Sequence, residues 1–152
     1  MNAVELEGVV KRYGRQLALN GVSLTIPKGS ICALIGPNGC GKTTTMGVLA
    51  GLLQIESGRV DVLGKGPFDA RKHAGRVSLM PQDAVPSGHV PIIDSLRYYA
   101  ELQGMDRASA KREAQASLEK VQLSDRARSR FGQLSHGMRR RFSIAQALLG
   151  KP

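Results

Sequence analysis

The stretch GPNGCGKTTT, from Gly36 to Thr45, directly follows the apolar run ICALI, which begins at Ile31. It matches the pattern G-x-x-x-x-G-K-[ST], in which a glycine-rich loop joins a strand to a helix. Glycines let the chain curl tightly enough for backbone N–H groups to converge on a polyphosphate. The unpaired N–H groups and the positive dipole end of the following helix favour the same anion. The stretch therefore predicts a phosphate-binding loop.

Each polar residue of this loop has a predicted task. Lys42 reaches the β- and γ-phosphates as a point charge and is the candidate catalytic cation. Thr43 offers its hydroxyl to Mg²⁺, and Thr44 gives another donor to phosphate. The remaining predicted phosphate contacts come from the loop itself, at Gly36, Pro37, Asn38, Gly39, Cys40 and Gly41. The alternative is a chance match, which the apolar run before the loop and the helical pattern after it make less plausible.

The composition is that of a globular domain, with 152 residues, of which 41% are hydrophobic and 22% charged. No apolar run approaches the roughly 18 residues that a membrane helix needs, and the first residues lack the apolar core of a signal peptide. We therefore expect a soluble, cytoplasmic chain. Cys32 and Cys40 are expected to be reduced thiols and not a disulfide framework.

The chain is strongly basic, since 22 Lys and Arg against 12 Asp and Glu give a net charge of +10. Such an excess is typical of proteins that bind nucleic acid or an anionic membrane surface. The alternative is that the charge serves polyphosphate binding and solvated helix faces. The basic residues are spread along the chain, with a dense set from Arg107 to Arg141. We therefore do not expect nucleic acid as a partner.

Hydrophobic periodicity predicts strands in the first half of the chain and helices in the second. The expected strands cover residues 4–14, 21–26, 31–36, 58–64 and 75–81. The unbroken run at 31–36 is typical of a strand covered on both faces. A helix is expected after the glycine loop, with a stripe formed by Met46, Leu49, Leu52 and Leu53. Three more helices are expected at 91–104, 108–121 and 137–149, with their apolar stripes packed in a core.

LSHGMRRR, from Leu134 to Arg141, precedes the last of these helices. Here the sequence resembles the ATP-binding cassette (ABC) family, whose signature is LSGGQ followed by basic residues. GPNGCGKTT also has the family's form of the phosphate loop, MPQD places Gln82 at its Q-loop, and KRYG places Tyr13 at its adenine-stacking aromatic. No [NT]-K-x-D guanine-reading motif occurs, which disfavours a GTPase. The resemblance covers essentially the whole chain.

The resemblance implies an α/β P-loop NTPase fold, with an N-terminal antiparallel β-subdomain, a helical subdomain and an incomplete core sheet. Residues 1–152 would then form a partial nucleotide-binding domain. Within it, 1–85 hold the β-subdomain and P-loop core, 86–133 the helical subdomain, and 134–152 the signature and its helix.

The resemblance also implies further site residues. Tyr13 would stack on adenine, and Gln82 would act in catalysis as a ligand near Mg²⁺ that senses the partner subunit. Ser135 and Gly137 would close over the γ-phosphate held by the phosphate loop of a second chain. The alternatives are that Tyr13 is only a strand-end aromatic, that Gln82 is a surface amide, and that Ser135 is only a helix N-cap.

The signature departs from the family pattern at two positions, where His136 replaces the first glycine and Met138 replaces the glutamine. LS-x-G-M followed by basic residues resembles exporter-type cassettes with separately encoded membrane subunits. The run Arg139–Arg141 in isolation looks like a DNA-contact patch. A basic run is normal at this place in the family, so nucleic acid is again not expected.

The function implied by the resemblance is that of the ATP-binding subunit of an ABC transporter, with export favoured by the signature variant. Two such domains would sandwich two MgATP, as a homodimer, and the block 86–133 would dock a transmembrane permease subunit. The chain would thus lie peripherally at the cytoplasmic face of the membrane. The alternatives are a non-transport cassette acting on DNA or ribosomes, and a nucleotide-binding fragment without hydrolysis. Only about fifty residues separate Gln82 from Leu134, which is too few for the coiled coils of DNA-repair members.

In the family, a strand ending in Asp-Glu follows the segment ALLGKP, with which this sequence stops. The aspartate holds Mg²⁺ and the glutamate activates water, so the chain is an ATPase only by resemblance. We expect it to bind nucleotide weakly, to hydrolyse it poorly, and to be marginally stable by itself.

Overall fold

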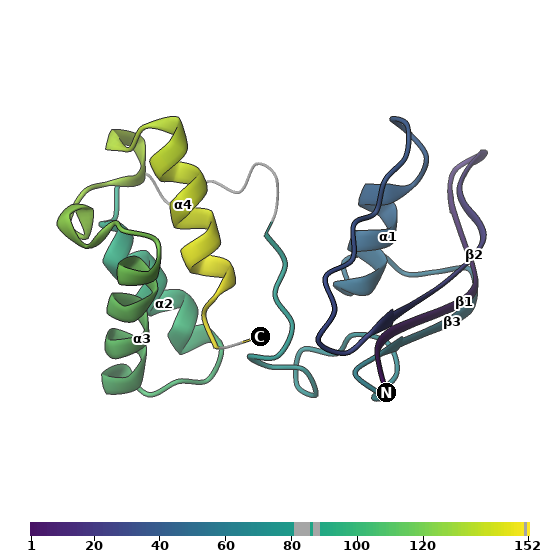
Figure 1. Cartoon of the computed structure of the whole chain (residues 1–152), viewed down its shortest axis with the longest axis horizontal. Helices are drawn as coiled ribbons and strands as arrows, with labels where there is room; N and C mark the ends of the chain where they lie inside the picture. Colours follow the sequence, from purple (N-terminus) through teal and green to yellow (C-terminus); the bar gives the residue numbers. More distant parts are fainter. Residues whose placement is uncertain (81–85, 87–88, 151) are drawn as a thin grey trace. The chain divides into compact units, whose positions relative to one another are not determined.

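The computed structural model describes residues 1–80, 86, 89–150 and 152. The chain divides into two compact units, Met1–His73 and Ala74–Pro152, each of which is treated by itself. Figure 1 labels the strands and α1 in unit 1, and α2, α3 and α4 in unit 2. No helix of the described residues is long and apolar enough to span a bilayer.

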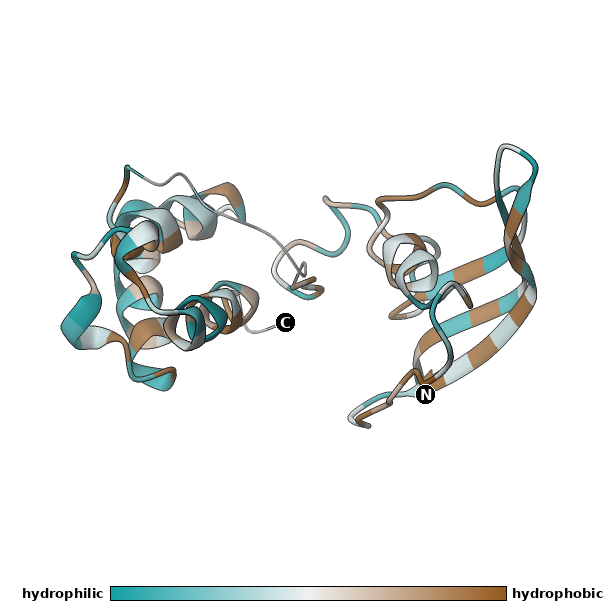
Figure 2. Ribbon diagram, turned by 90° about the horizontal axis from the view of Figure 1, so that it is seen from above, coloured by the Kyte–Doolittle hydropathy of each residue, from teal (hydrophilic) through white to brown (hydrophobic). Residues whose placement is uncertain are grey.

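Unit 1 is built on an antiparallel sheet with the strand order β2-β1-β3. β1 covers Asn2–Tyr13, β2 covers Gln16–Pro27 and β3 covers Ser57–Val62. β1 and β2 form a hairpin in which Tyr13 lies opposite Gln16. The hydropathy of the strands alternates, as Figure 2 shows, and the buried members are Leu6, Val9, Leu19, Val60 and Val62. The strands predicted at 4–14, 21–26 and 58–64 are confirmed.

α1, Lys42–Leu49, follows the glycine loop and buries Thr45, Gly47 and Val48. The helix predicted after the loop is thus confirmed, but the predicted apolar stripe is wrong, because Met46 is 43% exposed and neither Leu49 nor Leu53 is fully buried. The amides of Leu52 and Leu53 both donate to the carbonyl of Gly47, which turns the chain back on the helix. Leu52 is consequently 69% exposed.

The apolar run before the glycine loop is not in a strand, contrary to the prediction for 31–36. Ile31 is fully exposed and Ile35 is 88% exposed, so this run is not covered on either face. Residues 75–80 of the strand predicted at 75–81 are also irregular, with Leu79 and Met80 exposed. A parallel strand exists only through hydrogen bonds to neighbouring strands. Among the described residues no strand pairs with either segment, so apolar composition alone did not create them.

Unit 2 is a helical cluster formed by α2 (Ile92–Leu102), α3 (Arg107–Lys120) and α4 (His136–Ala147). Two short 3₁₀ segments, η1 (Ser124–Arg126) and η2 (Phe131–Gln133), connect α3 to α4. These helices confirm the three predicted at 91–104, 108–121 and 137–149. Their apolar stripes meet in one core, made of Ile92, Leu96, Ala100, Ala110, Ala114, Leu118, Val121, Leu123, Phe131, Leu134, Phe142, Ala145 and Leu149.

The ends of these helices follow ordinary capping chemistry. Pro91 is the N-cap of α2, and Gly104 follows its C-cap with a φ of 92° that favours glycine. Asp106 caps α3 by accepting hydrogen bonds from the amides of Ala108 and Ser109. Hydrogen bonds from Ser109, through its side chain and its amide, hold the pKa of Asp106 below its ordinary value.

Candidate functional site

The glycine loop has a backbone that only glycine accommodates at its last position. Gly41 is the N-cap of α1 and has a φ of 94°. A Cβ atom at this position would lie 2.7 Å from the carbonyl oxygen of Ala18 and 2.7 Å from a methyl group of Leu19. Both of these residues belong to β2, so the loop is pressed against the sheet. Gly41 is therefore required by conformation and by space.

The start of α1 presents unpaired donors to the loop. The first N–H groups of an α-helix have no acceptor within the helix, and Gly41 has no side chain to cap them. The amide of Thr45 is already within the helix, since it donates to the carbonyl of Gly41 at 2.8 Å. The first turn contains no acidic residue. An anion at this end of α1 would therefore meet favourable partial charge.

Lys42 adds a full positive charge to these amides. Its Nζ atom donates to the carbonyl oxygens of Gly36 and Pro37, both at 2.7 Å, and lies 3.7 Å from the Sγ atom of Cys40. The ammonium thus lies over the loop, and Cys40 is exposed. An ammonium held by neutral carbonyls can exchange them for phosphate oxygens, with which its hydrogen bonds are stronger.

The three threonines after Lys42 differ in exposure. Thr43 is exposed and Thr44 is half-buried. Thr45 is buried, and its hydroxyl donates to the carbonyl of Gly41 at 2.9 Å. Of the three, only Thr43 and Thr44 are therefore accessible to a ligand. These are the two threonines that the sequence predicts to contact Mg²⁺ and phosphate.

Tyr13 lies in the same unit as the loop. It is the last residue of β1 and is 48% exposed, with the Nζ atom of Lys11 5.6 Å from the ring centroid. Tyr13 pairs with Gln16 of β2. Ala18, which contacts Gly41, is two residues further along β2, a rise of about 7 Å. Tyr13 and the glycine loop therefore both lie next to the start of β2.

The remaining predicted site residues belong to unit 2 or are not described. Ser135 is the N-cap of α4, and its Oγ atom accepts from the amide of Met138 at 3.3 Å. Its interpretation as an N-cap is confirmed. Gly137 is exposed, and a Cβ atom there would have no neighbour within 4 Å. His136 is the exposed first residue of α4. Gln82 lies outside the described residues.

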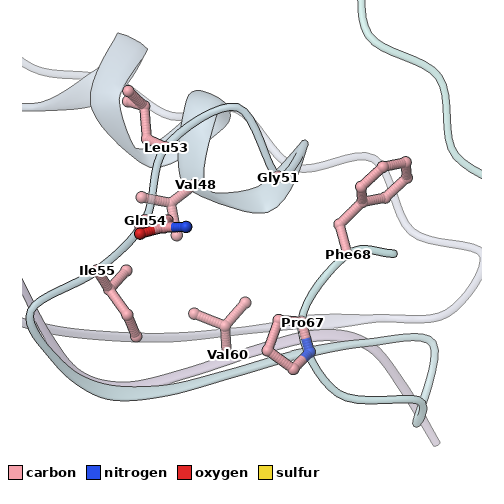
Figure 3. A pocket seen from close by; sticks show the side chains of 8 residues that line it. All are labelled: Val48, Gly51, Leu53, Gln54, Ile55, Val60, Pro67 and Phe68. Atoms are coloured by element: carbon pink, nitrogen blue, oxygen red, sulfur yellow. The ribbon is translucent and has the colours of Figure 1, made fainter. Parts of the chain in front are cut away.

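A cavity of about 430 Å³ lies in unit 1 at the other end of α1 from the glycine loop (Figure 3). Val48 of α1 and Val60 of β3 point into it from opposite sides. Its lining is completed by Gly51, Leu53, Gln54, Ile55, Pro67 and Phe68. None of the predicted site residues that the structure describes lines this cavity, and Gln54 is the only polar side chain among its described lining residues. A phosphate needs several converging donors, so the glycine loop suits phosphate and this cavity does not.

Sequence reasoning missed the contacts of the basic run in α4. Arg139 donates from Nη2 to the carbonyl oxygen of Gly132 at 3.0 Å. Arg141 donates from Nη1 to the carbonyl oxygens of Val121 and Gln122 at 3.2 and 3.1 Å. Two of the three arginines are therefore turned toward the main chain of their own unit. Helical spacing was the available signal, because it sends neighbouring residues in different directions.

The similarity to known proteins extends over nearly the whole chain. The family model described as ABC transporter matches residues 19–152. Nod factor export ATP-binding protein I of Rhizobium sp. (strain N33) is 35% identical over 152 residues, which are 99% of this chain and 50% of that protein. Spermidine/putrescine import ATP-binding protein PotA of Roseobacter denitrificans (strain ATCC 33942 / OCh 114) is 33% identical over 151 residues, 99% of this chain and 42% of that protein.

The fold agrees with these sequence relatives. The solved structure of the ADP conformation of MJ1267, described as an ATP-binding cassette of an ABC transporter, matches with a TM-score of 0.84 and 26% identity. The match covers 100% of this chain and 66% of that one. This chain spans about half the length of the curated relatives it matches, with 48%, 50% and 49% for three of them.

Proposed function

Since this chain belongs to the ABC transporter family and has the α/β fold of its ATP-binding cassettes, we propose that it binds MgATP at the glycine loop as part of a transporter's ATP-binding subunit. The observation that carries the proposal is the position of Lys42. Its ammonium lies over the glycine loop, where it binds the carbonyls of Gly36 and Pro37. The first N–H groups of α1 have no acceptor within the helix, and the first turn of α1 contains no acidic residue. This is a site for a polyphosphate.

Each part of the nucleotide has a proposed partner. The adenine stacks on the exposed ring of Tyr13, and the phosphates accept hydrogen bonds from the loop amides between Gly36 and Thr44. Lys42 leaves the carbonyls of Gly36 and Pro37 and donates to the β- and γ-phosphates. Charge-assisted hydrogen bonds of this kind are about twice as strong as neutral ones, so the exchange favours the bound state.

Mg²⁺ is proposed to arrive with the nucleotide. Among the described residues no group of three or more His, Cys, Asp or Glu side chains could hold a metal ion. Mg²⁺ is typically held by a few protein oxygens together with phosphate oxygens and water, and the exposed hydroxyl of Thr43 fits this role. Gln82 is the second proposed ligand. The ion would neutralise charge on the phosphates.

Hydrolysis is proposed for the whole transporter. The segment 28–55, which contains the loop and α1, has no Asp or Glu that could orient an attacking water. The described loop therefore supplies phosphate binding and charge neutralisation, which are the larger part of phosphoryl-transfer catalysis. The carboxylates of that reaction are proposed to be those of the family's Asp-Glu strand.

The proposed partners are a second copy of this subunit and a transmembrane permease subunit. Ser135 and Gly137 would close on the γ-phosphate bound by the other copy, which the exposed start of α4 and the open space at Gly137 allow. The helical block 86–133 would dock the permease and hold the subunit at the cytoplasmic face of the membrane. The names of the relatives include both export and import, so we propose ATP-driven transport without assigning a direction.

The test is nucleotide binding by this chain and by its lysine variants. We expect saturable MgATP binding, measured by titration calorimetry. Lys42→Ala should weaken it by about ten- to a hundredfold, the equivalent of one or two charge-assisted hydrogen bonds. Lys65→Ala is the matched control, because Lys65 also binds a carbonyl, that of Lys72, at 3.1 Å, but lies outside the loop. Equal affinities of the two variants, or no binding at millimolar MgATP, would contradict the proposal.

A further inference from the structure

The three consecutive arginines at the start of α4, Arg139–Arg141, leave the helix in three different directions. Successive residues of an α-helix are about 100° apart around its axis, so Arg139 and Arg141 leave α4 about 200° apart, on nearly opposite sides. Each of them binds main-chain carbonyls of a different neighbouring segment. Arg140 lies between them and is exposed. Two arginines of the run therefore bind main-chain carbonyls, and the third, Arg140, is exposed.

Arg141 binds the end of α3. There the amide of Leu123 donates to the carbonyl of Leu118 at 2.9 Å, and the amide of Gln122 donates to that of Glu119 at 3.0 Å. This is a Schellman end, with Gln122 in the left-handed conformation at a φ of 56°. It satisfies the carbonyls of Leu118 and Glu119, while those of Val121 and Gln122, at the end of the turn, accept from Arg141. The guanidinium also lies at the negative end of the α3 dipole.

Arg139 binds the segment that leads into α4. Besides its hydrogen bond to Gly132, its guanidinium carbon lies 5.5 Å from the ring centroid of Phe131. Phe131 packs edge-on against Phe142 of α4, with 5.5 Å between the ring centroids. One side of α4 is thus held to η2, and the opposite side is held to the end of α3.

We propose that Arg139 and Arg141 are positioning residues, which fix the rotation of α4 about its axis and so the direction in which Ser135 and Gly137 face. Apolar packing of α4 is non-directional, whereas hydrogen bonds to fixed carbonyls have a required geometry. Two such contacts on opposite sides of a helix oppose its rotation. The functional consequence rests on the proposed function, in which this end of α4 closes on the nucleotide of a second copy.

The experiment compares Arg139→Gln, Arg141→Gln and the matched control Arg140→Gln in the whole chain by residue-resolved hydrogen exchange. The reporter is the amide of Met138, which donates to Ser135 in the first turn of α4. We expect about tenfold faster exchange of this amide in the first two variants and no change in Arg140→Gln. The amides of Leu96 and Ala100, buried in α2, should keep their protection in all three.

A general loss of stability would raise the exchange of α2 together with that of α4. That result, or equal exchange of Met138 in all three variants, would overturn the proposal. Arg141→Lys keeps the charge with a single ammonium and should give an intermediate exchange rate. Arg141→Lys replaces Arg141→Gln in the experiment if Arg141→Gln does not fold. If the amide of Met138 exchanged in Arg141→Lys at the same rate as in the unchanged chain, the role of the guanidinium would be contradicted.

A second measurement separates positioning from nucleotide binding. MgATP affinity should be the same in all three glutamine variants, because the phosphate loop belongs to unit 1. MgATP-dependent self-association, measured by sedimentation, should weaken about tenfold in Arg139→Gln and Arg141→Gln only. Equal self-association of all three variants and the unchanged chain would overturn the functional part. Absence of nucleotide binding in the unchanged chain would instead contradict the proposed function, while the exchange pattern would still decide on positioning.

Discussion

Replacing Gly41 by alanine tests whether the glycine loop is held against the sheet as the structure describes. The new Cβ atom would lie 2.7 Å from the carbonyl oxygen of Ala18 and 2.7 Å from the Cδ2 atom of Leu19. The φ of 94° adds a conformational cost of about 1–3 kcal/mol for a non-glycine residue. Overpacking adds about 1–3 kcal/mol more, because a backbone carbonyl cannot yield as a flexible side chain does. We therefore expect unit 1 to lose about 2–6 kcal/mol of unfolding free energy.

Gly39→Ala is the matched control for this substitution. Gly39 has a similar φ of 81°, but a Cβ atom there would meet nothing within 4 Å. Its cost should be the conformational part alone, about 1–3 kcal/mol. The difference between the two variants therefore isolates the contact between the loop and β2.

The assay is urea unfolding followed by the amide resonances of Leu6 and Val9, which are buried in the sheet of unit 1. These resonances report on unit 1 without the helical signal of unit 2. Gly41→Ala should unfold at a clearly lower urea concentration than Gly39→Ala, with an unchanged slope. Equal midpoints for the two variants would refute the close approach of Gly41 to β2.

Three further outcomes are expected. Alkylation of Cys40, in a background where Cys32 is replaced by serine, should block nucleotide binding, and saturating MgATP should slow the labelling; labelling unaffected by MgATP would contradict this. Ser135→Ala should destabilise α4 by about 1 kcal/mol through loss of its N-cap, seen as a lower melting temperature than for Ser143→Ala. Hydrogen bonds hold the pKa of Asp106 below 3.8, so its stabilisation is present above that pH and is lost as the pH falls through the lowered pKa. As the pH falls from about 5 to below 3.8, Asp106→Asn should therefore lose less stability than the unchanged chain, and parallel urea midpoints for the two would contradict this.

Much of unit 2 could be predicted from the sequence because its signals are local. The apolar stripes of α2 and α3 repeat at helical spacing, and they meet in the core of unit 2, where Leu96 and Leu118 are fully buried. Pro91 and Gly104 mark the ends of α2 for reasons of backbone conformation that need no distant partner. The same holds for the glycine loop, whose positive φ angles and following helix depend on neighbouring residues.

The apolar segments at 31–36 and 75–80 could not be predicted in the same way. Their composition is typical of buried strands, but pairing depends on residues far along the chain, and no described strand pairs with them. Leu52 is a different case, because its exposure has a local cause. Gly51, with a φ of 70°, ends α1 in a turn in which the amide of Leu52 donates to the carbonyl of Gly47, so the apolar spacing does not continue through Leu52.

The sequence by itself determined the glycine loop, the helices and the family, because these depend on residue types at short, regular spacing. Only the tertiary structure decided that Gly41 is pressed against Ala18, that Thr45 belongs to the helix and not to a ligand, and that Arg139 and Arg141 bind carbonyls on opposite sides of α4. The residue type determines which interactions a side chain is able to make. Its partner is chosen by the packing of segments that are distant in the chain, and a hydrogen bond exists only where that packing brings donor and acceptor to within about 3 Å.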